Sequence, residues 1–293
     1  MYLKIQNAWR EGTLRDQVLK IDNSVIQHGP FNDRVYLMKL SPMDHKDVPA
    51  RVEEIAENNG YSKIFSKIPS SAKGHFQETG HVEEAYVPGM YNGYEGASFM
   101  AKFLSDERGN EQSPDEVKAV ISTALSKLNE SKEVQLSGDE ECFVCTGEDV
   151  REMAKIYGEI FSSYPFPIKD PEYLLRTMQE NLIYFGIRKA GKIVALSSCE
   201  MDVGNSNVEM TDFATLPEYR GRGYSYYLLK KMESKMREMG IITAYTIARA
   251  RSYGMNITFS RSSYSYAGTL VNNTNISGSI ESMNVWYKKL GQM

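Results

Sequence analysis

Cysteine, tryptophan and histidine are scarce in this chain, with three, two and four copies in 293 residues. Three cysteines are too few for the disulfide framework of a small secreted protein. Cys142 and Cys145 form one C-x-x-C pair, but no second pair and no nearby histidine completes a zinc site. The histidines all precede residue 82, and none has a partner at metal-binding spacing. We therefore expect no metal.

Long apolar runs and a strong excess of either charge are also missing. No segment approaches the roughly 20 apolar residues needed to span a bilayer. Residues 1–12, MYLKIQNAWREG, lack the apolar core of a signal peptide. The net charge of −4 argues against a general nucleic-acid binder, which needs a basic face. We predict a cytoplasmic protein with no membrane and no nucleic-acid partner.

What is present is an ordinary globular composition, with 41% hydrophobic and 25% charged residues. A length of 293 residues allows two domains. The most polar region is 105–141, and inside it Ser113 and Pro114 begin a helix with an apolar stripe. The sequence therefore predicts an N-terminal α/β accessory domain over 1–110, a helical linker over 111–140 and a second domain over 141–293.

The predicted C-terminal domain alternates strands and helices, which is typical of an α/β fold whose mixed, twisted sheet is flanked by helices. Stretches of β-formers indicate strands, and apolar stripes at helical spacing indicate helices. The expected strands cover residues 141–146, 182–188, 192–200, 208–215, 243–249, 264–271 and 280–287. The expected helices cover 148–161, a short segment from Asp170, 224–239 and a short segment that contains Asn256.

The most informative stretch is residues 207–240, where a strand, a short turn and a glycine-flanked arginine pair precede a long amphipathic helix. The first turn of a helix carries unpaired backbone N–H groups, and the helix dipole favours an anion there. Gly221 and Gly223 lie just before the helix, where a missing side chain lets a ligand approach the backbone. The layout predicts a pyrophosphate site, although its spacing matches neither a dinucleotide-binding G-x-G-x-x-G nor a P-loop.

Residues 220–225 resemble the R-x-x-G-x-G/A motif of the GNAT acetyltransferases, with Ser225 in place of the last small residue. The resemblance implies a GNAT fold for the C-terminal domain and acetyl-CoA as the cosubstrate. It implies that the pyrophosphate is bound by Arg220, Gly221, Arg222, Gly223, Tyr224 and Ser225. The preceding strand would pair with the pantetheine arm and orient the thioester through Phe213, Ala214 and Thr215.

Acetyl transfer to an amine requires the loss of a proton from an ammonium whose pKa is near roughly 10.4. Glu209 is the candidate base, eleven positions before Arg220, where GNAT enzymes with a glutamate base place it. Its carboxylate would act through water or with a raised pKa, or it would only bind the ammonium of the substrate. Asp212 is a second candidate for substrate binding, or it holds a backbone turn in place.

Four further candidates come from the resemblance. Asn256 matches an asparagine that many GNAT members place at the start of a short helix, in contact with the pantetheine. Its alternative is an ordinary helix cap. Tyr264 is the candidate general acid, although the family tyrosine falls at Ser263, and its alternative is an aromatic that packs in the next strand. Tyr164 and Phe166 belong to a loop that closes over the acceptor in GNAT folds, or they are hydrophobic anchors.

Longer runs resemble the β-lysine N-acetyltransferases over nearly the whole chain. The C-terminal runs are EMTDFATLPEYRGRG, TAYTIARARSYGMNITF, YAGTLVNNTNISGSIESMNVWYKKL and YPFPIKDPEYL, and the N-terminal run is EEAYVPGMYNGYEGASFMAKFLSDER. The resemblance implies direct transfer, in a ternary complex, from acetyl-CoA to the ε-amino group of β-lysine. The product, Nε-acetyl-β-lysine, is a compatible solute. The carboxylate of this substrate calls for an arginine, and Arg249 and Arg251 are candidates.

Two other functions stay open. One keeps the fold but takes lysine, a polyamine or a peptide amine as the acceptor. The other is a non-catalytic module that binds CoA or forms a dimer. A homodimer is left open for the enzyme as well.

The N-terminal region resembles the second half of the C-terminal domain. Without gaps, the alignment places Phe76 on Phe259, Gly80 on Ser263, His81 on Tyr264 and Ala85 on Gly268. The identity is low, so chance similarity is the alternative. A true repeat would make the N-terminal domain a degenerate half of a GNAT fold, and without an arginine–glycine loop it would not bind CoA.

Overall fold

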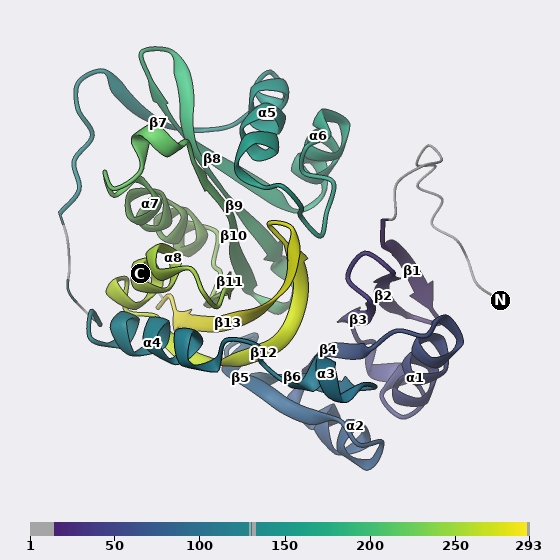
Figure 1. Ribbon diagram of the computed structural model, residues 1–293. Coiled ribbons are helices and arrows are strands. Elements are labelled where there is room, and N and C mark those ends of the chain that lie inside the picture. Colours follow the sequence, from purple (N-terminus) through teal and green to yellow (C-terminus); the bar gives the residue numbers. More distant parts are fainter. Residues whose placement is uncertain (1–14, 129, 131–132, 292–293) are drawn as a thin grey trace.

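The computed structural model describes residues 15–128, 130 and 133–291. Residues 1–12, on which the expectation of no signal peptide rests, lie outside the described residues. One sheet runs through the described chain, with 13 strands in the order β1-β2-β3-β4-β6-β5-β12-β13-β11-β10-β9-β8-β7. Helices cover both faces of its C-terminal part (Figure 1).

The N-terminal half, residues 17–103, contributes one end of this sheet. Its strands are β1 (Gln17–Ile21), β2 (Ser24–Gly29), β3 (Arg34–Lys39), β4 (Lys63–Pro69), β5 (Val82–Tyr91) and β6 (Glu95–Phe103). Its helices are α1 (Val48–Asn59) and α2 (Lys73–Glu78), and the short α3 (Asp106–Gly109) follows.

The C-terminal half, residues 140–289, contributes the other end, and α4 (Pro114–Leu125) precedes it. Its strands are β7 (Glu140–Val144), β8 (Leu182–Lys189), β9 (Lys192–Asp202), β10 (Asn207–Thr215), β11 (Thr243–Arg249), β12 (Ser265–Ile276) and β13 (Ser279–Lys289). Its helices are α5 (Val150–Ile160), α6 (Pro171–Glu180), α7 (Tyr224–Glu238) and α8 (Tyr253–Arg261).

Each strand and helix predicted for the C-terminal domain is present, because local signals mark its ends. Asp170 caps α6, where its side chain accepts the Glu172 N–H at 3.0 Å. Gly240 follows α7 with a φ of 76°, a left-handed conformation that favours glycine after a helix. The predicted α/β fold with a mixed sheet is therefore confirmed.

The two halves of the sheet have the same topology, apart from the extra edge strand β7. Counted inward from the edge, the strands of each half follow the order first, second, third, fourth, sixth and fifth along the chain. In each half one parallel pair, β3–β4 or β10–β11, lies among antiparallel neighbours. The two halves meet at the antiparallel pair β5–β12, where Ala85 lies opposite Gly268. The sequence alignment places these same two residues at equivalent positions. Because all six strands of the N-terminal half follow the same order as those of the C-terminal half, the repeat is larger than the predicted half unit. Because the sheet is continuous, the domain limits at 110 and 140 stay predictions.

Equivalent aromatic contacts support the repeat. Phe76 and His81 meet edge-to-face with their ring centroids 5.3 Å apart. The aligned pair, Phe259 and Tyr264, meets in the same way at 5.0 Å. In each half this contact ties a short helix to the strand that follows it.

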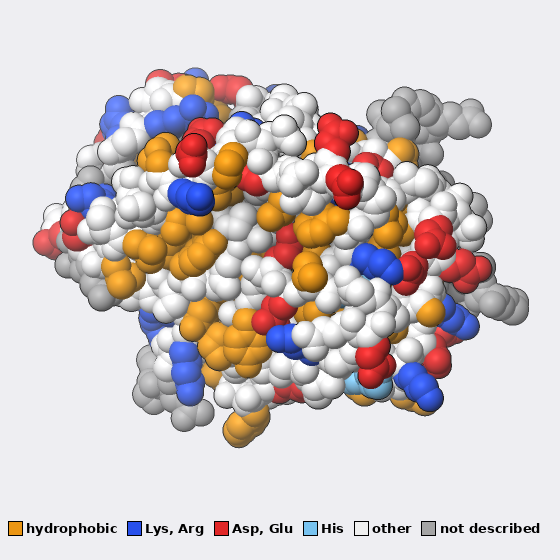
Figure 2. All heavy atoms as spheres, turned by 60° about the horizontal axis from the view of Figure 1, so that its bottom comes forward, with side chains coloured by type: hydrophobic (Ala, Val, Ile, Leu, Met, Phe, Trp, Pro, Cys, Tyr) orange, Lys and Arg blue, Asp and Glu red, His pale blue; other side chains and the backbone are white. Residues whose placement is uncertain are grey.

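The core divides according to the faces of the sheet. One cluster packs α7 and α8 against β8 to β11, and another packs α5 and α6 on the opposite face. The second cluster continues into the N-terminal half through Tyr36 and Phe65, so the two halves share part of their interior. Figure 2 shows acidic and basic side chains scattered among hydrophobic ones on the face that lies lowest in Figure 1. In the described residues, every helix is too short or too polar to cross a bilayer.

Candidate functional site

Strand β10 opens away from its parallel neighbour. It pairs with β11 only over residues 207–209, although it continues to Thr215. On its other edge a bulge interrupts the pairing with β9, since Thr211 lies opposite Ser198 and Ala214 lies opposite Leu196. Asp212, inside the bulge, has a φ of 54°. The extra residue turns the successive side chains of Thr211 and Asp212 into one cavity. It also leaves the edge of 210–215 that faces β11 free for an extended ligand.

The start of α7 carries the predicted anion site. Gly223 occupies the N-cap with a φ of 85° and supplies no side chain to cap the first N–H groups. The Arg220 Nε donates to the Thr215 carbonyl at 3.3 Å, and the Arg222 guanidinium lies 5.3 Å from the Tyr219 ring. Among the described residues, no carboxylate forms an ion pair with either arginine. Uncapped N–H groups and two arginines without acidic partners fit a diphosphate.

Part of this loop is covered by the segment that precedes β7. A Cβ added to Gly223 would lie 2.8 Å from a methyl group of Val134. The Tyr224 side chain points away from the loop, because it is buried and its hydroxyl donates to the Glu140 carboxylate. Only the backbone of Tyr224 is therefore available to a ligand, and Val134 occupies the space next to Gly223.

The predicted pantetheine strand has an alternating environment. Phe213 faces α8, with its ring 5.7 Å from that of Phe259, whereas Ala214 is buried in the cluster on the opposite face. Thr215 is half-buried at the end of β10. Their backbone, rather than their side chains, borders the opening between β10 and β11.

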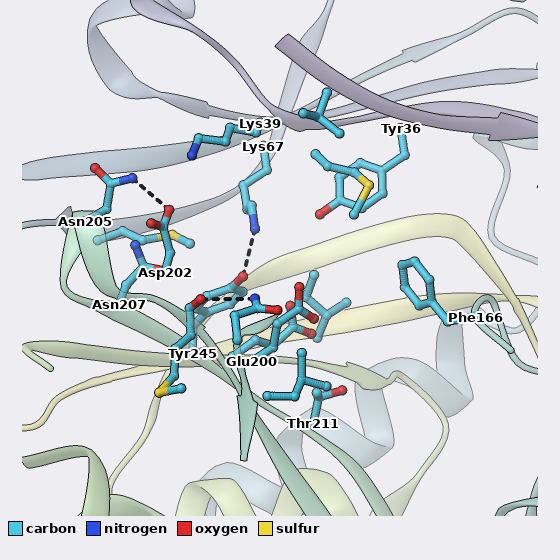
Figure 3. A pocket seen from close by; sticks show the side chains of 18 of the residues that line it. Tyr36, Lys39, Lys67, Phe166, Glu200, Asp202, Asn205, Asn207, Thr211 and Tyr245 are labelled. Carbon is cyan, nitrogen blue, oxygen red and sulfur yellow. Dashed lines mark hydrogen bonds between the residues drawn. The ribbon is translucent and has the colours of Figure 1, made fainter. Parts of the chain in front are cut away.

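A cavity of about 890 Å³ lies between the two halves of the chain. This volume is in the range of small-molecule sites. In Figure 3, Lys39, Lys67 and Tyr36 approach it from the N-terminal half, and Glu200, Thr211 and Tyr245 approach it from the C-terminal half. Neither half forms the site alone.

Glu209 lines this cavity at the point where β10 leaves β11. It lies directly opposite Glu200 on β9, an arrangement that like charges disfavour. Burial and the Glu200 carboxylate raise the pKa of Glu209 to about 7, against the opposing effects of Lys67 and of a hydrogen bond from Tyr245. Lys67 in turn donates to the Tyr245 hydroxyl at 2.9 Å. A carboxylate with this pKa is suited to accept a proton near neutral pH.

Asp212 is occupied by protein contacts. Its carboxylate accepts hydrogen bonds from the Tyr164 hydroxyl at 2.5 Å and from the Ser198 hydroxyl at 2.6 Å. Burial raises the pKa of Asp212, and these two hydrogen bonds oppose the rise. Tyr164 and Phe166 both line the cavity. Asp212 therefore holds the Tyr164 loop against the bulge, which is the structural alternative left open from the sequence.

Two predicted site residues lie elsewhere. Tyr264 is completely buried in the cluster beneath α7 and α8, and it is not among the residues that line the cavity of Glu209. Asn256 is also completely buried; its amide donates to the carbonyls of Arg249 and Ser252, and its Oδ1 accepts from Trp286 and Asn284. Both side chains are enclosed by protein in this structure, and their roles toward acetyl-CoA stay predictions.

The two arginines suggested for the substrate carboxylate are also engaged. Arg249 forms a bidentate pair with Glu281, at 2.9 and 2.6 Å, and Arg251 approaches the same carboxylate at 3.6 Å. Neither lines the cavity. Among the charged residues that do line it, Arg34, Lys67 and Glu200 were missed. Each lies on a strand with at least one other charged residue, so no local signal set it apart.

The cysteines show no sign of metal binding or pairing. All three are free thiols, and burial raises the pKa of Cys145 and Cys199. In the part of the chain that the structure describes, no group of three or more His, Cys, Asp or Glu side chains could hold a metal ion.

Known proteins resemble this chain at two levels. The model of the acetyltransferase (GNAT) family matches residues 150–254. A curated β-lysine N(6)-acetyltransferase of Methanococcus maripaludis is 41% identical over 280 residues, which cover 93% of this chain and 98% of that protein. One from Methanosarcina mazei is 41% identical over 142 residues, 48% of this chain and 52% of that protein. The N-acetyltransferase YodP of Bacillus subtilis is 31% identical over 276 residues, 91% of this chain and 96% of that protein.

Proposed function

Since the chain belongs to the GNAT N-acetyltransferases, in the family of the β-lysine N(6)-acetyltransferases, we propose that it transfers the acetyl group of acetyl-CoA to the ε-amino group of β-lysine. The observation that carries the proposal is Glu209, with a pKa raised to about 7, in a cavity beside the opening between β10 and β11. A cytoplasmic location and a homodimer stay predictions.

GNAT enzymes use acetyl-CoA, and the residues at the start of α7 fit its pyrophosphate. We assign the diphosphate to the N–H groups and arginines of residues 220–225, and the pantetheine to the free edge of β10 over 210–215. Val134 must move aside for this ligand, because its methyl groups lie against Gly223. When bound, acetyl-CoA supplies the activated acetyl group.

The acceptor amine enters from the cavity and reacts directly in a ternary complex. Glu209 accepts the proton of the ammonium, directly or through water, so that the free amine can attack the thioester carbonyl; the C–N bond forms, the C–S bond breaks and CoA leaves as the thiol. Glu200 keeps the Glu209 carboxyl basic enough for this task, and Lys67 limits the repulsion between the two acids. Glu200 and Glu209, opposite each other in this cavity, suit an acceptor that carries ammonium groups.

An acceptor panel tests the proposed function. The panel contains β-lysine, α-lysine, spermidine and a short peptide with a free amino terminus, and the readout is the release of free thiol from acetyl-CoA. We expect the highest kcat/KM with β-lysine and a product acetylated on the ε-amino group. A higher kcat/KM for spermidine or the peptide would contradict the proposal, and absence of turnover with every amine would favour a non-catalytic module.

Reversing the charge of the loop tests the cofactor site. In the double variant Arg220→Glu/Arg222→Glu, affinity for acetyl-CoA should fall by about 100-fold or more, since each of the two lost charge-assisted hydrogen bonds contributes about 1.5–3 kcal/mol. The measurement is the rise in melting temperature on addition of acetyl-CoA, which follows affinity by mass action. Lys231→Glu, further along α7, is a charge-reversal control away from the loop and should keep the wild-type shift. Equal shifts in all three proteins would refute the assignment of the loop.

A further inference from the structure

Arg34 is a buried charge at the wall of the acceptor cavity. It begins β3 in the N-terminal half, its side chain lines the cavity, and only 3% of its surface is exposed. One amino group of its guanidinium donates to the Asn273 carbonyl and, at 3.1 Å, to the Thr274 hydroxyl. Its Nε is buried without a hydrogen-bond partner. Burial lowers the pKa of Arg34 to about 10, so the side chain remains a cation at neutral pH.

Within the described residues, no carboxylate forms an ion pair with Arg34. Asp16 raises the pKa of Arg34 through space, but the Asp16 carboxylate accepts hydrogen bonds from the Phe31 and Asn32 N–H groups at 3.0 and 3.3 Å. Arg108, a second buried arginine at the junction of the halves, does have an ionic partner, Asp33, at 3.1 Å. A buried cation without a counterion is costly, and a ligand carboxylate would remove that cost.

Tyr36 connects Arg34 to the acidic end of the cavity. The Arg34 guanidinium lies 5.2 Å from the Tyr36 ring and 5.6 Å from the Phe65 ring. Burial raises the pKa of Tyr36, Lys67 opposes that rise, and Glu209 and Glu200 add to it, so the Tyr36 hydroxyl lies near these charges. Arg34 and the two acids thus line one cavity, with the Tyr36 ring beside Arg34.

We infer that Arg34 binds the carboxylate of the acceptor, and that the N-terminal half thereby selects an amino acid over a simple polyamine. The inference rests on the proposed function, because it places the reacting amine at Glu209. β-Lysine carries its carboxylate and its ε-amine at opposite ends of a six-carbon chain, so it can pair with a cation and with an acid of the same cavity. A diamine without a carboxylate would leave Arg34 buried and unpaired, and sites of this kind discriminate strongly against such analogues.

The test compares β-lysine with its primary amide, which keeps both amines but lacks the negative charge. For the wild type we expect a higher kcat/KM for β-lysine than for the amide. In Arg34→Met the kcat/KM for β-lysine should fall on the order of 100-fold, mainly through KM, with little change for the amide. Arg34→Lys keeps the positive charge but loses the planar set of guanidinium N–H donors, so its kcat/KM for β-lysine should fall less. If Arg34→Met does not fold, Arg34→Lys takes its place in the test.

Arg108→Met is the matched control, because it removes a buried arginine from the same junction outside the cavity. Arg108→Met should lower the stability of the protein but keep the wild-type ratio of kcat/KM for β-lysine to kcat/KM for its amide. An unchanged ratio in the Arg34 variants would overturn the role of Arg34 while leaving the proposed function intact. If the wild type acetylates neither compound, the proposed function itself fails.

Discussion

Replacing Glu209 with glutamine is expected to lower kcat by about 100-fold or more, the loss typical of a missing general base. Glutamine keeps the shape of the side chain but cannot accept a proton, so the fall should appear in kcat rather than in KM. A residue that only bound the substrate ammonium would instead raise KM. Steady-state kinetics with β-lysine, followed by thiol release, separate the two roles that the sequence left open.

The pH dependence provides the second part of this test. Because the pKa of Glu209 is raised to about 7, its basic form predominates only above that pH, and kcat/KM of the wild type should rise through pH 7. Glu209→Gln should abolish this rise. Glu200→Gln is the control: it removes the neighbouring charge, lowers the pKa of Glu209 and moves the rise to lower pH. Wild-type kinetics for Glu209→Gln at every pH would exclude the base.

Features encoded in a few consecutive residues could be predicted from the sequence. The loop before α7 is marked by Gly221 and Gly223, whose left-handed φ values of 80° and 85° suit glycine. The helix itself is marked by its apolar stripe, and α6 by the cap at Asp170. Glu209 was proposed because the resemblance to GNAT enzymes places a glutamate base eleven positions before the loop arginine, within one strand–turn–helix unit.

Features that depend on the pairing of strands far apart in the sequence could not be predicted. Arg34 and Lys67 reach the cavity only because β5 pairs with β12 and the two halves face each other. Spacing within the chain also did not show that Asn256 and Tyr264 are completely buried, because burial is decided by the tertiary structure. The gapless alignment was the one sequence signal for the junction, because it placed Ala85 on Gly268.

Gly268→Val is therefore expected to be the most destabilising single change at the junction. Gly268 has a φ of 150°, and a Cβ there would lie 2.1 Å from the Glu84 carbonyl oxygen and 2.7 Å from the Ala85 Cα. Backbone strain and overpacking together should lower the free energy of unfolding by about 3–5 kcal/mol. In a chain of this size that corresponds to a fall of roughly 10 °C in melting temperature.

The same substitution should also reduce activity in the fraction that remains folded, because any movement at β5–β12 displaces Arg34 and Lys67 from Glu209. Chemical denaturation measures the first effect, and kcat/KM for β-lysine well below the melting temperature measures the second. Gly74→Val in α2 is the matched control, since nothing lies within 4 Å of its Cβ position and it is remote from the cavity. It should keep wild-type activity and nearly wild-type stability. If Gly268→Val is as stable and active as Gly74→Val, neither the stability nor the activity depends on close packing at this junction.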